Sequence, residues 1–122
     1  MTNVLAPLND LVLVANVTVR NAVTGAEEAV STGTVTGFLA TSPGPAAVTA
    51  DAALSVAGVY VGAQAGFTAG DWMFQLDAAV LTKTLLDTHF TTATPYFIVS
   101  RTSAVRQVIR LEYRQYMEAI VG

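Results

Sequence analysis

Apolar and polar positions alternate along much of this chain, and the alternation predicts β-strands. Between Leu11 and Arg20, one face of the predicted strand carries Leu11, Leu13, Ala15, Val17 and Val19. Further strand signals cover Val30–Leu39, Val59–Ala65 and Trp72–Leu76, with a weaker one at Ala47–Leu54. Tyr96–Arg101 is predicted as a strand from its β-propensity. A period of two with β-branched residues is typical of strands that bury one face. Turn-forming segments separate the runs, notably Asn21–Gly25 and Thr41–Pro45.

Two segments allow more than one interpretation. In Ala78–Phe90, Val80, Leu81, Leu85 and His89 fit one face of a helix, but an irregular connection between strands fits as well. From Thr102 to Gly122, the pattern fits a strand as far as about Tyr113, or a helix with an apolar stripe from Val105 to Ile120. The β-branched residues of Val105–Ile109 favour the strand.

These elements predict an all-β fold. About seven short strands, separated by turns at roughly ten-residue intervals, are typical of an antiparallel immunoglobulin-like β-sandwich. We expect one domain over residues 1–122, with an N-terminal arm at 1–10 and a C-terminal tail at 114–122. A short helix within 78–90 or at the C-terminus remains open.

The composition of the chain indicates that partner proteins cover much of its surface. Hydrophobic residues make up 52% of the chain, charged residues 12%, and the mean hydropathy is +0.51. A soluble domain carries roughly 25% charged residues. A membrane helix needs about 20 consecutive apolar residues, whereas glycines, prolines and hydroxyl residues interrupt the uncharged stretch Ala29–Ala50. We therefore expect no membrane segment and no signal peptide, but a surface that partner proteins cover.

The residues with reactive side chains do not form a recognisable catalytic set. The chain has no cysteine, and His89 is its only histidine. Asp71, Asp77 and Asp87 have no spacing that brings them together, and Asp71 after Gly70 fits a turn. The run Gly33–Gly37 lies in a predicted strand rather than before a helix, so it indicates a bulge or a close backbone approach, not a phosphate loop. We expect no enzyme, no cofactor and no metal.

Trp72, Phe74 and Leu76 share one face of a predicted strand. Such a face usually belongs to the core, although it would also suit a ligand groove. An exposed aromatic platform would indicate a carbohydrate- or host-surface-binding module.

The arginines are the most informative charges. Residues 101–122 carry four of the six basic residues against two glutamates, whereas the rest of the chain is acidic. This segment is either a solvated strand edge or a docking surface for an acidic neighbour, such as another copy of this chain. Its interface candidates are Arg101, Arg106, Arg110, Arg114, Tyr113 and Tyr116. The net charge of −3 and the absence of lysine here argue against nucleic-acid binding.

The order of these features resembles a diffuse group of small immunoglobulin-like virion proteins of tailed bacteriophages. The resemblance runs from about Leu11 to Tyr113 and rests on four features: a first strand ending in a glycine turn (Val12–Gly25), a threonine-rich strand (Thr32–Leu39), Gly58-Val59-Tyr60-Val61-Gly62, and Gly70-Asp71-Trp72. The insertion at Ala78–Thr94 departs from the compact hairpin of the group.

The resemblance implies a non-enzymatic component of a virion, assembled in the host cytoplasm. The first expectation is a capsid cement or decoration protein that contacts the major capsid protein and forms homo-oligomers. A neck or tail component arranged in a ring is the alternative, and a carbohydrate- or host-surface-binding module is a further one.

Overall fold

The protein is mainly β, with 43% of the described residues in strands and one short helix. The computed structural model describes residues 3–44, 48–101 and 106–114. The strands are β1 (Asn3–Leu5), β2 (Leu11–Asn16), β3 (Thr18–Arg20), β4 (Glu27–Ala29), β5 (Val35–Ala40), β6 (Ser55–Ala57), β7 (Val59–Tyr60), β8 (Asp71–Leu76), β9 (Tyr96–Arg101) and β10 (Arg106–Tyr113). The helix α1 spans Lys83–Phe90, and a 3₁₀ turn spans Ala52–Leu54.

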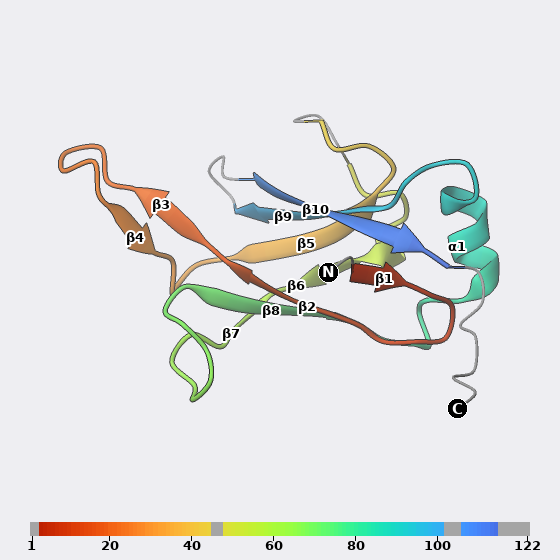
Figure 1. Ribbon diagram of the computed structural model, residues 1–122, viewed down its shortest axis with the longest axis horizontal. Coiled ribbons are helices and arrows are strands. Elements are labelled where there is room, and N and C mark those ends of the chain that lie inside the picture. Colours follow the sequence, from red (N-terminus) through yellow and green to blue (C-terminus); the bar gives the residue numbers. More distant parts are fainter. Residues whose placement is uncertain (1–2, 45–47, 102–105, 115–122) are drawn as a thin grey trace, which may run out of the picture.

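The main sheet is mixed and curls into a half-barrel beside two small sheets. Its strand order is β1-β10-β9-β5-β6, while β2-β8-β7 forms a three-stranded sheet and β3-β4 a two-stranded one. Figure 1 shows the main sheet above the three-stranded sheet, with the β3–β4 hairpin extending from one end of the molecule and α1 at the other. The chain passes directly from β6 to β7 through Gly58, whose amide donates to Val35 O at 2.7 Å.

The sheet differs from the predicted antiparallel sandwich because β1 pairs with β10 in parallel. The segment expected to form an N-terminal arm thus contributes a strand to the sheet of its own chain. Leu5 is fully buried, and its carbonyl accepts a hydrogen bond from the Arg114 amide at 3.0 Å. The predicted C-terminal tail, apart from Arg114, lies outside the described residues.

Strands that bury one face were predicted well. β8, β9 and β10 match the predicted strands, and the C-terminal segment is a strand to Tyr113 rather than a helix. The first predicted strand is present but breaks at Val17 into β2 and β3. The described part of the chain contains ten strands where about seven were expected, because several pairings involve only two or three residues.

Other strand predictions were wrong. Residues 30–34 are not a strand, and β5 begins only at Val35. The predicted strand Ala47–Leu54 instead ends in a 3₁₀ turn, which begins where Asp51 Oδ1 accepts from the Ala53 amide at 2.9 Å. The predicted turn at Val56–Gly58 contains the end of β6, and β7 extends only to Tyr60.

The core lies between the two layers and collects the inward faces of β2, β5, β8 and β9. The alternating burial of β2 confirms the predicted face, since Leu11, Leu13 and Ala15 are buried. Phe74 and Phe97 form an edge-to-face pair with ring centroids 5.5 Å apart. A Cβ on Gly37 would lie 2.3 Å from Phe97 Cζ, so this glycine permits the close backbone approach that the sequence predicted.

Trp72 belongs to this core and is not an exposed aromatic platform. Its side chain is only 5% exposed, and its Nε1 donates to Val30 O at 2.8 Å. The ring of Tyr60 packs against it edge-on, at 5.4 Å between centroids. Phe74 and Leu76 are buried on the same face, which confirms that this face is core.

Candidate docking surfaces

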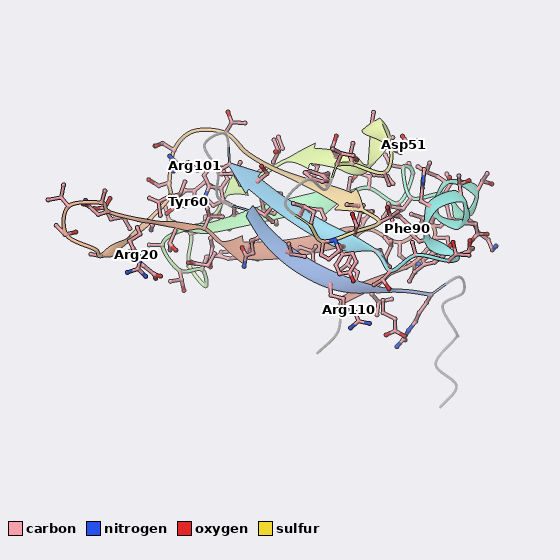
Figure 2. The ribbon with its side chains drawn as sticks, turned by 90° about the horizontal axis from the view of Figure 1, so that it is seen from above. Arg20, Asp51, Tyr60, Phe90, Arg101 and Arg110 are labelled. Atoms are coloured by element: carbon pink, nitrogen blue, oxygen red, sulfur yellow. The ribbon has the colours of Figure 1, made fainter. Side chains whose placement is uncertain are left out.

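The strand β10 and its neighbour β9 position the predicted interface arginines. Arg110 is exposed on the outer face of β10, since the next residue, Leu111, points into the core. Arg101 pairs in register with the buried Val35, so its side chain lies on the face of the sheet opposite to that of Arg110. It also lies at the end of β9 that is remote from Arg110. Figure 2 shows Arg101 and Arg110 well apart. Arg101 and Arg110 therefore do not share a surface.

The remaining candidates have different surroundings. Arg106 pairs in register with Ser100, and Tyr116 lies outside the described residues. The Arg114 guanidinium donates to both carboxylate oxygens of Glu112, at 3.3 and 3.4 Å, so its charge is compensated locally. Among the described acidic residues, none lies within ion-pair distance of Arg110.

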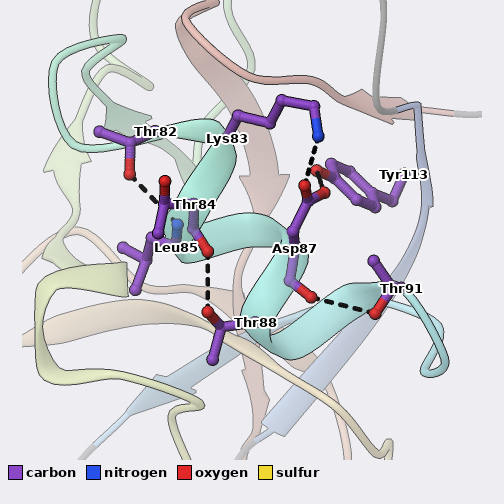
Figure 3. Close-up of polar contacts among 8 residues, drawn as sticks. All are labelled: Thr82, Lys83, Thr84, Leu85, Asp87, Thr88, Thr91 and Tyr113. Carbon is purple, nitrogen blue, oxygen red and sulfur yellow. Dashed lines mark hydrogen bonds and ion pairs between the residues drawn. The ribbon is translucent and has the colours of Figure 1, made fainter.

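Tyr113 connects β10 to α1 within the same molecule. Its hydroxyl donates to Asp87 Oδ1 at 2.6 Å, and the other oxygen of Asp87 pairs with Lys83 Nζ (Figure 3). The Tyr113 ring also packs edge-on against Phe90, at 6.3 Å between centroids. These contacts hold the helix against the end of the strand. They give Tyr113 a structural role that the sequence, which suggested an interface residue, did not predict.

Local sequence explains why α1 forms at this place. Thr82 is the N-cap, and its hydroxyl oxygen accepts from the Leu85 amide at 3.3 Å. Leu81 and Leu86, both fully buried, occupy the positions of a hydrophobic staple. The helix is one of the two interpretations that the sequence left open. Of the face expected for it, Leu81 is buried, but Leu86 and Phe90 are buried in place of Leu85 and His89. The cap-and-staple pattern was the clue in the sequence.

A groove lies between the end of α1 and the outer part of β10. Its volume is about 620 Å³, and it is lined by Phe90, Ala93, Thr94, Pro95, Arg110, Leu111, Glu112 and Tyr113. Leu111 and Phe90 are buried side chains of the core, and Arg110 and Glu112 are exposed. We call this the β10 groove. Its accessible lining is more polar than apolar, as at the rim of a protein–protein interface.

A second surface is the outer face of the three-stranded sheet. Val14, Met73 and Val59 stand side by side across β2, β8 and β7, and Val12 lies next to them on β2. Val12, Val14 and Val59 are 50%, 44% and 57% exposed. No described strand pairs with the second edge of β2. We call these four side chains the outer apolar face.

Asp71 closes this face at one end and serves as a turn residue, as predicted. Its carboxylate accepts from the Asn16 side chain and from the Thr68 amide, each at 2.8 Å. The Asn16 hydrogen bond and then that of Thr68 lower the pKa of Asp71 below its ordinary value of 3.8.

The other residues considered for chemistry lie in separate places. Asp87 belongs to the Tyr113 contact, whereas Asp77 accepts from Gln75 Nε2 at 3.4 Å. His89 Nε2 lies 3.9 Å from Asp51 Oδ2, which makes an ion pair only when the imidazole is protonated. Within residues 3–44, 48–101 and 106–114, no group of three or more His, Asp or Glu side chains could hold a metal.

No helix in the described ranges is both long and apolar enough to cross a membrane. Comparisons with protein-family models, with characterised proteins and with solved structures gave no match to this chain. The two surfaces therefore have to be interpreted from their own physical chemistry.

Proposed function

We propose that this chain is a non-enzymatic structural protein of a tailed-bacteriophage virion, in the first place a capsid cement or decoration protein. The outer apolar face carries the proposal, because it combines exposed valines with an open strand edge. Soluble proteins protect such edges with lysine, proline, bulges or a covering element. The sequence Leu-Val-Leu-Val-Ala-Asn of β2 contains neither lysine nor proline.

A neighbouring virion protein that covers this face would remove the exposed valines from water. Burial of apolar area stabilises an interface by about 25 cal/mol per Å² before the costs of association. A cement protein acts in this way: it bridges adjacent capsid subunits and adds interface area without any chemical step. The low charge of residues 29–70, where Asp51 is the only charged residue, fits a surface of this kind.

A ring-forming neck or tail component is the second candidate, and one observation favours it. The two ends of the molecule differ, with the β3–β4 hairpin at one and α1 at the other (Figure 1). The β10 groove lies beside α1. Contacts between unlike surfaces generate rings or filaments rather than two-fold dimers.

The immunoglobulin-like relationship is part of the same proposal. Its support is the stacking of two β layers around one core and the sequence features shared with the phage group. The parallel β1–β10 pair and the α1 insertion would then be additions of this chain. A carbohydrate-binding module has less support, because the buried Trp72 is unsuited to a sugar platform.

Quantitative mass spectrometry of purified particles of the virus that encodes this chain tests the proposal. A copy number comparable to that of the major capsid protein is expected for cement. A number equal to a single ring would support the neck or tail candidate instead. Absence of the chain from purified, infectious particles would refute both.

A further inference from the structure

The β3–β4 hairpin carries an exposed apolar tip on a hydrogen-bonded turn. Asn21 shapes this turn, because its side-chain oxygen accepts from the Val23 and Thr24 amides at 2.8 and 3.1 Å. The backbone carbonyl of Asn21 also accepts from the Gly25 amide at 2.8 Å, and Gly25 takes a positive φ of 73°. Val23 at the tip is 93% exposed. The turn therefore presents a large apolar side chain to solvent in a fixed geometry, which lowers the entropic cost of docking.

The hairpin is also acidic where it approaches the tip. Glu27 and Glu28 are both exposed on β4, and the cation near them is Arg20, whose guanidinium lies 3.9 Å from Glu27. Glu28 accepts a hydrogen bond from the Asn21 side chain at 2.8 Å. The two glutamates and one arginine leave the hairpin with a negative charge.

The β10 groove has the complementary properties. Its lining includes atoms of Phe90, Pro95 and Leu111 and the exposed Arg110 and Glu112. The carboxylate of Glu112 pairs with Arg114, which leaves Arg110 as the uncompensated charge of the described lining. Within the described part of the chain, Arg110 is not matched by a nearby carboxylate, unlike Arg114 and Lys83. The helix α1, fixed by the contacts of Tyr113 with Asp87, holds one wall of the groove in place.

The hairpin and the groove lie at opposite ends of the long axis. In Figure 1 the hairpin extends at the left and α1 stands at the right, and in Figure 2 Arg20 and Phe90 mark these two ends. The hairpin is thus remote from the groove of its own molecule, whereas a second copy placed end to end can present its hairpin there. The opposite charges of the hairpin and of Arg110 then point to a head-to-tail contact.

We propose that copies of this chain associate head to tail, the Val23 tip of one copy seating in the β10 groove of the next. Glu28 of the first copy faces Arg110 of the second, whereas Glu27 points to the other face of the hairpin and lies beside Arg20. Each copy offers both partners of the contact, so the assembly closes into a ring or grows as a filament. This contact is independent of the proposed virion function. If the chain assembles head to tail but is absent from purified particles, only the virion proposal is refuted.

Two single variants, measured by sedimentation-velocity ultracentrifugation, test the contact. Val23→Asp damages the tip, and Arg110→Glu damages the groove; both residues are exposed, so the fold should survive, as circular dichroism can verify. The wild type should form concentration-dependent oligomers. Each variant alone should raise the dissociation constant at least about tenfold, as expected for a central contact residue.

The decisive measurement is the mixture of the two variants. Val23→Asp retains an intact groove and Arg110→Glu an intact tip, so the mixture should form a one-to-one heterodimer and nothing larger. Val48→Asp and Arg101→Glu are the matched controls, because they make the same substitutions on other parts of the surface. Both controls should assemble like the wild type.

Three results would overturn the proposal. The first is a wild type that stays monomeric throughout the concentration series. The second is a mixture that stays monomeric, which would indicate a symmetric contact. The third is equal disruption by the controls, which would indicate non-specific association through apolar and charged surface.

Discussion

Replacing Gly37 by alanine should destabilise the fold, because the core leaves no room for a single methyl group at this position. The added Cβ would lie 2.3 Å from Phe97 Cζ, 2.5 Å from Phe97 Cε2 and 2.9 Å from Phe74 Cδ1. Ordinary contact begins at 3.4 Å, so the Phe97 ring would have to retreat by about 1.1 Å. Phe97 is fully buried and Phe74 packs against it, which blocks the retreat.

The magnitude follows from two opposing terms. Overpacking of a core costs about 1–3 kcal/mol. Alanine leaves the unfolded chain fewer conformations than glycine does, which stabilises the folded state by about 0.4–1 kcal/mol and offsets part of that cost. We expect Gly37→Ala to lower the free energy of unfolding by a net amount of about 1–2 kcal/mol. Urea unfolding, followed through the emission of Trp72, the only tryptophan, measures it.

Gly44→Ala is the matched control, since nothing lies within 4 Å of a Cβ there. It should leave the stability unchanged or slightly raised. A Phe97→Leu background should reduce the cost of Gly37→Ala, because the smaller side chain relieves the clash. Equal effects of Gly37→Ala and Gly44→Ala, or an unchanged cost in the Phe97→Leu background, would refute the reasoning.

Three further predictions concern single side chains. Asp71→Asn should lower the urea midpoint at pH 7, because the pKa of Asp71 is depressed in the folded state. The difference in midpoint from the wild type should shrink as the pH falls below 3.8, and a difference independent of pH would contradict this prediction. Tyr113→Phe should cost about 1 kcal/mol through its lost hydrogen bond to the half-buried Asp87, and Tyr113→Ala should cost more; a Tyr113→Phe unfolding midpoint equal to that of the wild type would argue against the hydroxyl. Trp72 emission should be weakly quenched by iodide, since Val30 O accepts from its buried Nε1, and quenching as efficient as that of free tryptophan would exclude this burial.

The predictable strands are those in which one face meets the core. In β2 and β8 every second residue is buried, so the hydrophobic pattern of the sequence carries the register of the strand. The strands that were missed, such as β4 and β6, are three residues long with mostly exposed side chains. Such strands form because a neighbour offers backbone hydrogen bonds, and no periodicity of their own marks them.

The candidate site was predictable only in part. The sequence located the positive charge in residues 101–122, whereas the exposure of Arg110 on the outer face of β10 came from the structure. The sequence could not show that Arg101 lies on the opposite face, which follows from the register with Val35. It made Tyr113 an interface candidate but could not show its hydrogen bond to Asp87, because a tyrosine near arginines looks the same whether its partner is another chain or its own helix.

The sequence by itself determined a mainly β chain with a buried aromatic strand, a low surface charge and a basic final segment. These properties depend on residue type and on spacing between near neighbours, which local sequence carries. The tertiary structure alone decided that β1 pairs with β10 in parallel, that the hairpin and the β10 groove lie at opposite ends, and that α1 forms a wall of the groove. These features arise from contacts between residues far apart in the chain, whose energies depend on three-dimensional packing rather than on any local pattern.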